Sequence, residues 1–338
     1  MDLIGAQLFP IAERSQAASA RRAAVVLAAH VGLDEVTGGR VAVVVTEAAT
    51  NLIKHAGGGE IILAPFAEAG VGGMDMLALD KGPGMVNVAK YRRDGFSTAG
   101  TAGIGLGAIA RMASFSDIYS RPGLGTAVLA RFAAPPRASS LGAPSMEVGG
   151  VSVPKRGEEV CGDGWAANVR GLMAMIVVAD GLGHGILAAD AAREAVKTVQ
   201  ASVGERPGVV LEAAHGALRG TRGAAVGVTS VDCGRGTVTF AGVGNIAGAI
   251  IADGACRSVV SHNGIVGHQF RTVQEFTYPW PPDAVLVLHS DGLTSHWSLD
   301  RYPGLAQRHP CLIAGVLYRD FTRGRDDVTV VVAKRRAA

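Results

Sequence analysis

The sequence predicts an α+β protein of two domains. At 338 residues the chain is long enough for two ordinary domains, each with its own hydrophobic core. The stretch from Ala133 to Ser145 contains small residues and prolines without hydrophobic periodicity, which is typical of a linker. Long helical patterns open the part before this stretch, and the part after it is rich in strand-like apolar runs. We therefore expect a first domain over residues 1–132, a linker over 133–145 and a second domain over 146–338.

The first part opens with two helical patterns. Residues 15–31 are rich in Ala and Arg with an apolar stripe, and a second helix is expected over 37–55, where the Gly57–Gly59 run ends it. The elements expected next are strands over 60–65 and 74–79, a helix that begins near Gly105, and a hairpin over 118–132 that turns at 122–125.

Apolar strands dominate the second part. A strand over 173–179 is followed by an amphipathic helix over 187–203. Further strands are expected over 224–232, 237–243, 247–252 and 284–289, with tight turns at Gly234–Gly236 and Asp253–Gly254.

Composition excludes several classes of function. The net charge is only +3, and no Lys/Arg run is interleaved with aromatic residues, which argues against a nucleic-acid partner. The four cysteines are widely spaced, which argues against a zinc site or a disulfide framework and favours a reducing compartment. The N-terminus lacks a signal-peptide pattern, and apolar stretches end well before the ~20 residues of a membrane span. We expect a cytoplasmic protein with no membrane partner.

Glu47 and Asn51 are four residues apart on a predicted helix, so both project from one face. A carboxylate in such a position can orient or deprotonate a nucleophile, and an amide oxygen can bind magnesium beside phosphates. Taken alone, the pair is better explained by a solvated polar stripe.

Glycine-rich turns follow in the same part. Asp80 ends an apolar strand and can accept a hydrogen bond from an adenine amino group, while Gly82 and Gly84 allow close approach of the backbone. Gly103, Gly105 and Gly107 precede a helix whose free amides can cradle phosphates. Each pattern alone also fits an ordinary turn. No G-x-x-x-x-G-K-[ST] motif occurs, which excludes a P-loop.

In order and spacing, these motifs together with Gly125-Thr126 resemble the N, G1, G2 and terminal boxes of the GHKL ATP-binding fold. The stretch Thr46–Ala56 is most similar to the small anti-sigma-factor serine kinases of the RsbT and RsbW type. The resemblance implies an α/β sandwich, a mixed sheet covered by helices, that binds ATP with Mg²⁺. It also implies Glu47 as general base and a lid between Met85 and Ala102. The nucleotide contacts it implies are Asn51 as magnesium ligand, Asp80 as adenine partner, Thr126 behind the adenine site, and Gly82, Gly84, Gly103, Gly105, Leu106 and Gly107.

In the second part, carboxylates flank apolar strands. Asp180 and Asp291 follow such strands, Asp326 precedes one, and Asp163 follows Cys161-Gly162. Carboxylates at one sheet edge can hold two hard cations, which activate a water and clamp a phosphate. Asp-Gly pairs also mark ordinary turns, and for Asp253-Gly254 we adopt that interpretation.

Asp180–Gly185, Ser290–Gly292 and Asp326–Thr329 resemble, in order, the motifs of the metal-dependent protein phosphatases (PPM family) of the SpoIIE and RsbX branch. The resemblance implies a β-sandwich flanked by helices and Mg²⁺ or Mn²⁺ as metal. The implied ligands are Asp163, Asp180, the Gly181 carbonyl, Asp291 and Asp326, with Asp327 as the alternative to Asp326. His184 is a candidate catalytic residue or a residue that shapes the turn. The glycine run within Phe240–Ile246 lies between strands and is interpreted as structural.

The two resemblances together imply a bifunctional partner-switching protein. Its second domain would dephosphorylate a phosphoserine or phosphothreonine protein, expected to be a STAS-domain antagonist or a stressosome-like protein, and would reach a sigma factor indirectly. Its first domain would phosphorylate the same or a related partner, or would be only a nucleotide-gated docking module. An NAD-type oxidoreductase is disfavoured, because neither glycine loop lies in a strand–loop–helix unit with a ribose-binding acid.

Overall fold

The structure, a computed structural model, describes residues 5–68, 70–88, 105–134, 145–202, 204–269 and 273–336. The chain forms two compact units. The first unit contains residues 1–139 together with 302–319, and the second contains 140–301 and 320–338. The first unit is therefore discontinuous in sequence, because residues 302–319 belong to it together with the first part of the chain. The boundaries expected at 132 and 146 stay a prediction.

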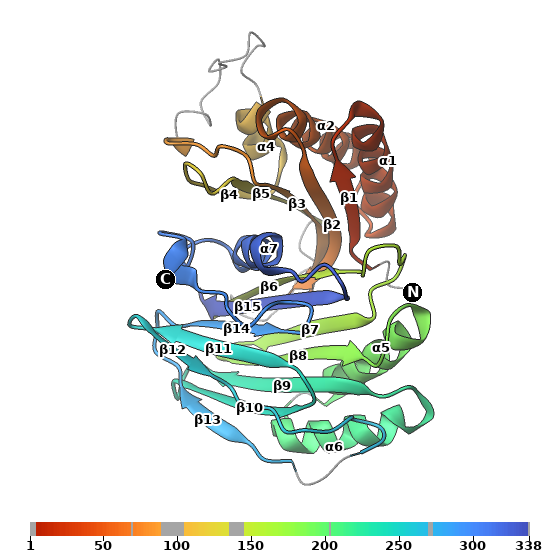
Figure 1. The fold of residues 1–338 in the computed structure, drawn as a ribbon, viewed down its shortest axis with the longest axis vertical. Helices are drawn as coiled ribbons and strands as arrows, with labels where there is room; N and C mark the ends of the chain where they lie inside the picture. Colours follow the sequence, from red (N-terminus) through yellow and green to blue (C-terminus); the bar gives the residue numbers. More distant parts are fainter. Residues whose placement is uncertain are drawn as a thin grey trace. The chain divides into compact units, whose positions relative to one another are not determined.

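The first unit is built on a five-stranded sheet with strand order β1-β2-β3-β5-β4 (Figure 1). All described pairings in it are antiparallel, so the mixed sheet expected from the resemblance is not seen among the described strands. Two of these pairings are hairpins, which are antiparallel by construction. The strands are β1 (Gln7–Ile11), β2 (Gly59–Glu68), β3 (Val71–Asp80), β4 (Phe115–Ser120) and β5 (Thr126–Ala133).

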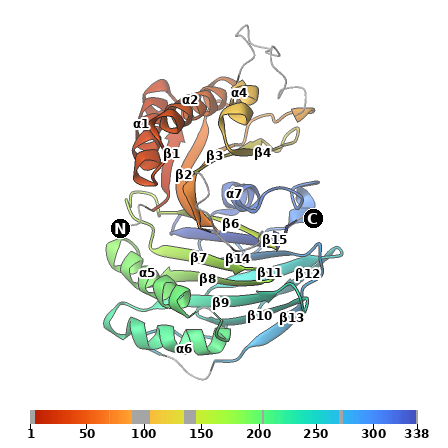
Figure 2. The ribbon, with the colours of Figure 1, turned by 180° about the vertical axis from the view of Figure 1, so that it is seen from behind.

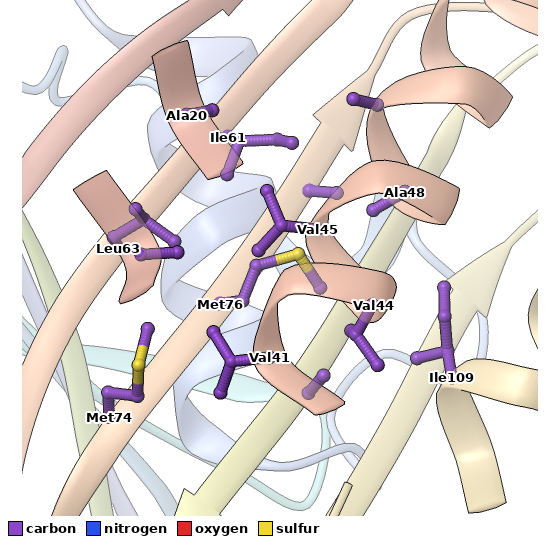
Figure 3. Packing of buried hydrophobic residues seen from close by; sticks show 14 of the residues in the cluster. Ala20, Val41, Val44, Val45, Ala48, Ile61, Leu63, Met74, Met76 and Ile109 are labelled. Atoms are coloured by element: carbon purple, nitrogen blue, oxygen red, sulfur yellow. The ribbon is translucent and has the colours of Figure 1, made fainter. Parts of the chain in front are cut away.

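Helices α1 (Arg14–His30) and α2 (Glu35–Asn51) cover one face of this sheet, and α4 (Gly105–Met112) packs beside α2. Figure 3 shows side chains of α2 facing alternate residues of β2 and β3, as period-2 strands require. The side chains in this layer are Val41, Val44, Val45 and Ala48 from α2 and Ile61, Leu63, Met74 and Met76 from the strands.

The sequence predicted both long helices. Asp34 caps α2, because its side chain accepts a hydrogen bond from the Thr37 N–H at 2.7 Å. After Asn51 the helix continues as a π-helical turn, η1 (Leu52–Ala56), which Gly57 closes at φ 72°. The edge strand β1 was not predicted, because it is short and contains Pro10, which fits only an edge strand.

The opposite face of the sheet is covered by α7 (Pro310–Phe321), whose residues up to Arg319 belong to the first unit. Leu77 and Leu79 alternate with Met74 and Met76 along β3 and point to this side. A Cβ on Gly315 would collide with Leu77 and would lie 3.2 Å from Cδ2 of Leu79, so the helix approaches the sheet closely. This helix was not predicted from the sequence.

The second unit contains two five-stranded sheets with strand orders β13-β10-β9-β8-β7 and β12-β11-β14-β15-β6. A core that includes Ile176, Phe240 and Leu286 draws on both sheets. Helices α5 (Ile186–Ala201) and α6 (Pro207–Ala217) cover the other face of the first sheet (Figure 2). The strands are β6 (Met146–Val153), β7 (Asp163–Arg170), β8 (Met173–Gly181), β9 (Ala224–Asp232), β10 (Thr237–Val243), β11 (Ala247–Ala252), β12 (Ala255–Ser258), β13 (Phe276–Pro279), β14 (Val285–His289) and β15 (Val328–Arg335).

The apolar strands expected in the second part are confirmed as β8, β9, β10, β11 and β14, and the expected amphipathic helix is α5. The α+β class and the division into a helix-covered sheet and a β-sandwich with helices are likewise confirmed. Within the described ranges of the chain, no helix combines the length and apolar character needed to cross a bilayer.

Candidate nucleotide site and metal centre

The structure brings Glu47 and Asn51 of α2 together with Gly105, the first residue of α4. Both side chains are half-buried and lie one helical turn apart. A Cβ on Gly105 would lie 3.4 Å from the Asn51 side-chain amide and 3.6 Å from Oε2 of Glu47. The free backbone N–H groups at the start of α4 therefore lie beside the Glu47 carboxylate and the Asn51 side-chain amide. Such N–H groups can bind phosphate, an amide oxygen can bind magnesium, and a carboxylate can orient a nucleophile.

Asp80 occupies the end of β3, where it pairs in register with Thr126 of β5. Its Oδ1 accepts hydrogen bonds from the Gly82 N–H at 2.8 Å and the Thr126 N–H at 3.1 Å. Burial raises the pKa of this carboxyl, while these two bonds and the charge of Arg319 act to lower it. Because both bonds end on Oδ1, an adenine amino group can be received by Oδ2.

The turns around Asp80 are held by Ser120, which sequence reasoning did not single out. Its Oγ lies 2.9 Å from Oγ1 of Thr126 and accepts a hydrogen bond from the Met85 N–H at 2.8 Å. Gly84 has φ 69°, and a Cβ there would collide with the Arg121 carbonyl oxygen. Ser120 thus joins the loop after β3 to the terminal-box threonine.

The remaining glycine-motif residues divide into two groups. Gly107 is buried in α4. Leu106 is partly buried and packs against the hydrophobic core to which α2 contributes. Gly103 and residues 89–102 of the expected lid lie outside the described residues.

In the second unit, Asp163 and Asp180 pair directly across β7 and β8. The next residue, Gly181, donates its N–H to the Gly162 carbonyl at 3.1 Å. A side chain at Gly181 would collide with Ala188 of α5, so glycine is required there for the helix to approach the strand end.

Ser290 links the ends of β14 and β7. Its Oγ donates to Oδ2 of buried Asp163 at 2.6 Å and accepts from the Thr329 N–H at 2.9 Å. Asn245 similarly donates its side-chain N–H to Oδ2 of Asp291 at 2.7 Å. Neither partner was singled out from the sequence, although Ser290 lies in the Ser-Asp-Gly motif and Asn245 in the glycine run interpreted as structural.

The carboxylates are close enough to repel one another. Burial and then the Asp180 charge raise the pKa of Asp163 well above its usual value. Burial, followed by the charges of Asp291 and Asp326, raises the pKa of Asp180 to about 7. A concentration of partly buried negative charge is what a divalent cation neutralises, so the residues present fit a metal centre.

The described part of the chain contains no cluster of three or more His, Cys, Asp and Glu side chains already arranged to hold a metal ion. The aspartates therefore meet at one region of the unit without forming a closed ligand shell. Their assignment as ligands stays a prediction.

Asp326 and Asp327 have different environments. Asp327 is buried and accepts a hydrogen bond from the Lys155 N–H at 2.8 Å, and burial raises its pKa. Asp326 is exposed, and its charge acts on Asp180. Oδ1 of Asp327 therefore anchors the start of β15, whereas its buried Oδ2 has no hydrogen-bond partner, and the choice between Asp326 and Asp327 as metal ligand stays a prediction.

His184 is paired with Glu158, a residue without any signal in the sequence. Nδ1 of His184 lies 2.7 Å from Oε1 of Glu158, and both side chains are partly exposed. A histidine oriented by a carboxylate can hold or transfer a proton. His289, in contrast, is buried and accepts a hydrogen bond from the Trp297 indole at 3.1 Å.

Two family models match the chain. Residues 10–132 match the histidine kinase-like ATPase domain, and residues 173–336 match the stage II sporulation protein E (SpoIIE) family. The fold and the comparisons define a fusion of a GHKL-type ATPase domain with a SpoIIE-type, PPM-family phosphatase domain.

One relative identifies the family of the first domain. The chain is 34% identical over 104 residues to the serine/threonine-protein kinase RsbT of Bacillus subtilis (strain 168), a match that covers 31% of this chain and 78% of that protein. Through its first domain the chain belongs to the RsbT family.

Solved structures that are similar to the chain include these two. One is described as "The bacterial stressosome: a modular system that has been adapted to control secondary messenger signaling", with 27% identity and a TM-score of 0.52 over 56% of this chain and 99% of that chain. The other contains the PP2C phosphatase domain and part of the regulatory domain of SpoIIE from Bacillus subtilis, with 18% identity and a TM-score of 0.49 over 79% of this chain and 80% of that chain.

Proposed function

We propose that this chain is a bifunctional, cytoplasmic partner-switching protein. Its SpoIIE-type domain removes phosphate from a phosphoserine or phosphothreonine protein, and its RsbT-like domain uses ATP to phosphorylate the same or a related protein. The expected partner is a STAS-domain antagonist or a stressosome-like protein. The observation that carries the proposal is the cluster of mutually repelling aspartates around the Asp163–Asp180 pair, on a chain that also assembles Glu47, Asn51 and Gly105.

In the phosphatase domain, Asp163, Asp180, the Gly181 carbonyl, Asp291 and Asp326 would hold Mg²⁺ or Mn²⁺. Bound metal would supply an activated water and neutralise phosphate charge. Ser290 and Asn245 fix the orientation of two of these carboxylates through the hydrogen bonds described above. The His184–Glu158 pair holds a proton that can be given to the leaving serine or threonine oxygen.

The surroundings of this centre favour a protein substrate over a small phosphoester. Leu182, Ile186 and Leu187 follow Asp180 and are 51%, 66% and 54% exposed. Large apolar side chains grouped on a surface are typical of a protein-binding site. A folded partner that presents its phosphorylated side chain can cover these residues while the phosphate reaches the aspartates.

In the ATPase domain, Asp80 receives the adenine base, Asn51 holds Mg²⁺ and Glu47 accepts the proton of the partner's hydroxyl. The alternative is a nucleotide-gated docking module. The position of Glu47 beside the start of α4 favours catalysis, because docking alone does not need a base beside the phosphates.

The kinase reaction is tested with a STAS-domain protein encoded beside this chain, ATP–Mg²⁺ and the Asp180→Asn variant, in which dephosphorylation is suppressed. Intact-mass spectrometry should show the gain of one phosphate, and the gain should disappear when Glu47→Ala is added. Glu35→Ala, an exposed acid on the same helix, is the matched control and should leave the gain unchanged. ATP binding and partner binding without any gain would reduce the domain to a docking module.

The phosphatase reaction is tested on the phosphorylated partner with Mn²⁺ or Mg²⁺. Asp163→Asn and Asp180→Asn should each abolish phosphate release, whereas Asp253→Asn, in a turn between β11 and β12, should leave it intact. Equal rates for all three variants would exclude the aspartate cluster as the catalytic centre.

A further inference from the structure

Arg319 is a buried arginine at the end of α7. Only 6% of the residue is exposed, and it belongs to the first compact unit. Arginine is almost never buried unless its charge and N–H groups are satisfied, because the loss of hydration is costly. Its neighbours therefore indicate what this residue does.

The Arg319 guanidinium contacts the two strand ends that form the expected adenine site. Nη1 donates to the Asp80 carbonyl at 2.8 Å and lies 3.5 Å from the Thr126 carbonyl. Asp80 and Thr126 are register partners on β3 and β5, so a single guanidinium holds both strands at their ends.

Gly125 provides the space for this contact. Its φ is 69°, a conformation that favours glycine, and a Cβ there would lie 3.0 Å from Nη1 of Arg319. A side chain at position 125 would also collide with the Asp80 carbonyl oxygen. The glycine of the terminal box is therefore matched to an arginine almost 200 residues further along the chain.

Asp80 is consequently held from two sides. Gly82 and Thr126 donate to its side chain, and Arg319 donates to its backbone carbonyl. Burial raises the pKa of Asp80, and the nearby positive charge of Arg319 opposes part of that rise. The hydrogen bonds orient the carboxylate and the arginine charge favours its ionised form, which is the acceptor that an adenine amino group needs.

We propose that Arg319 is a positioning residue of the adenine site, so that a residue encoded within the phosphatase half of the sequence completes the nucleotide site of the RsbT-like domain. This inference rests on the proposed function, in which Asp80 receives the adenine base. Helix α7 would then contribute to nucleotide selection, although it lies outside the nucleotide-binding motifs of the first domain.

The segment 302–319 is anchored independently of Arg319. Arg308 forms an ion pair with Asp117 at 3.1 Å, and the Cys311 thiol donates to Oδ2 of Asp75 at 3.5 Å. Gly315 packs on Leu77 and Leu79. Replacement of Arg319 should therefore leave the segment in place, and replacement of Arg308 provides a matched control that weakens the anchor without touching Asp80.

The test uses the full chain and measures the affinities for Mg²⁺–ATP and Mg²⁺–GTP by calorimetry. Arg319→Met should weaken ATP binding about tenfold and reduce the preference for ATP over GTP, as expected for the loss of a charged hydrogen-bond donor. Arg319→Lys, which keeps the charge, should recover most of the affinity. Arg308→Met should retain the preference of the unmodified chain.

Coupling to Asp80 distinguishes positioning from general destabilisation. Asp80→Asn should itself lose most of the ATP preference, and adding Arg319→Met to it should cause less than a twofold further change. Fully additive effects, or equal effects of Arg319→Met and Arg308→Met, would overturn the role of Arg319 and leave the adenine site standing. If Asp80→Asn binds ATP with unchanged affinity and preference, the adenine assignment fails and the proposal with it.

A variant that does not fold is recognised by thermal unfolding before binding is measured. In that case Arg319→Lys and Arg319→Gln, which both keep hydrogen-bond donors, provide the comparison. Loss of ATP preference in the glutamine variant and its retention in the lysine variant is the result expected. Identical preference in both variants would contradict the proposed role of the charge.

Discussion

Asp163 and Asp180 lie opposite each other on adjacent antiparallel strands, and the charge of Asp180 is one cause of the raised pKa of Asp163. Carboxylates buried this close together repel each other and destabilise the fold, and a bound divalent cation would neutralise their charge. We therefore expect the proposed metal site and the stability of the second unit to be coupled.

Removing one of these charges should stabilise the metal-free protein. In the presence of a chelator, Asp180→Asn should raise the unfolding temperature by about 2–4 °C, which corresponds to roughly 1 kcal/mol of relieved repulsion. With Mn²⁺ the order should reverse, because only the unmodified chain gains from binding. Differential scanning calorimetry with and without Mn²⁺ measures both effects, and equal gains from Mn²⁺ in the two proteins would contradict this prediction.

Ser290→Ala should impair metal binding more than it impairs folding. The substitution removes the 2.6 Å hydrogen bond that orients Asp163. Loss of such a supporting hydrogen bond typically costs about 10–100-fold in metal affinity or activity. A titration of phosphatase activity with Mn²⁺ should shift to higher concentration. Ser202→Ala, which removes a 2.9 Å hydrogen bond to the Thr198 carbonyl at the end of α5, is the control and should leave that midpoint in place.

His184 and Glu158 should act as one group. We expect His184→Gln to lower the phosphatase rate by about 10²-fold, and Glu158→Gln to lower it less, because the carboxylate acts by orienting the histidine. The double variant should equal His184→Gln alone, which a double-mutant cycle of initial rates tests. Glu159→Gln, the exposed neighbour, should have no effect. Additive losses of phosphatase rate in the double variant would show that the two residues act independently and would contradict this prediction.

Gly315→Ala should destabilise the first unit, because the added Cβ would collide with Leu77. Overpacking of this kind costs about 1–3 kcal/mol. Gly39→Ala is the matched control, since it lies exposed on α2 with no atom within 4 Å of the new Cβ, and it should stabilise by about 0.5–1 kcal/mol. Urea unfolding of both variants, with and without ATP, measures the change in the free energy of unfolding. An unchanged urea midpoint for Gly315→Ala would contradict the close approach of α7.

The sequence predicted the elements whose side chains are buried in a regular pattern. Strands β9, β10 and β11 begin and end where the apolar runs do. Strands β7 and β12 escaped prediction because they are half-buried or exposed and therefore have no apolar signal. Helix α7 also escaped, because its apolar residues form no narrow stripe.

The same distinction applies to the sites. Asp80, Asp180 and Asp291 stand in short motifs that local spacing reveals. Ser290 and Glu158 act through partners 127 and 26 residues away, so their roles depend on how strands and loops meet in three dimensions. Arg319 is an extreme case, since its partner Asp80 is 239 residues distant. Motifs in the sequence therefore predicted the candidate site residues, but they did not predict the residues that orient them through hydrogen bonds.

The discontinuity of the first unit has a consequence for biosynthesis. Because residues 302–319 complete it, the face of its sheet that carries Leu77 and Leu79 stays uncovered during synthesis until these residues have left the ribosome. The usual order, in which an N-terminal domain finishes folding before the next one is made, is unavailable to this protein. Strand β15 of the second unit follows within a few residues. The ATPase and phosphatase domains therefore complete their folding at nearly the same point of synthesis, so a nascent chain never carries a finished ATPase domain beside a phosphatase domain that is still far from complete.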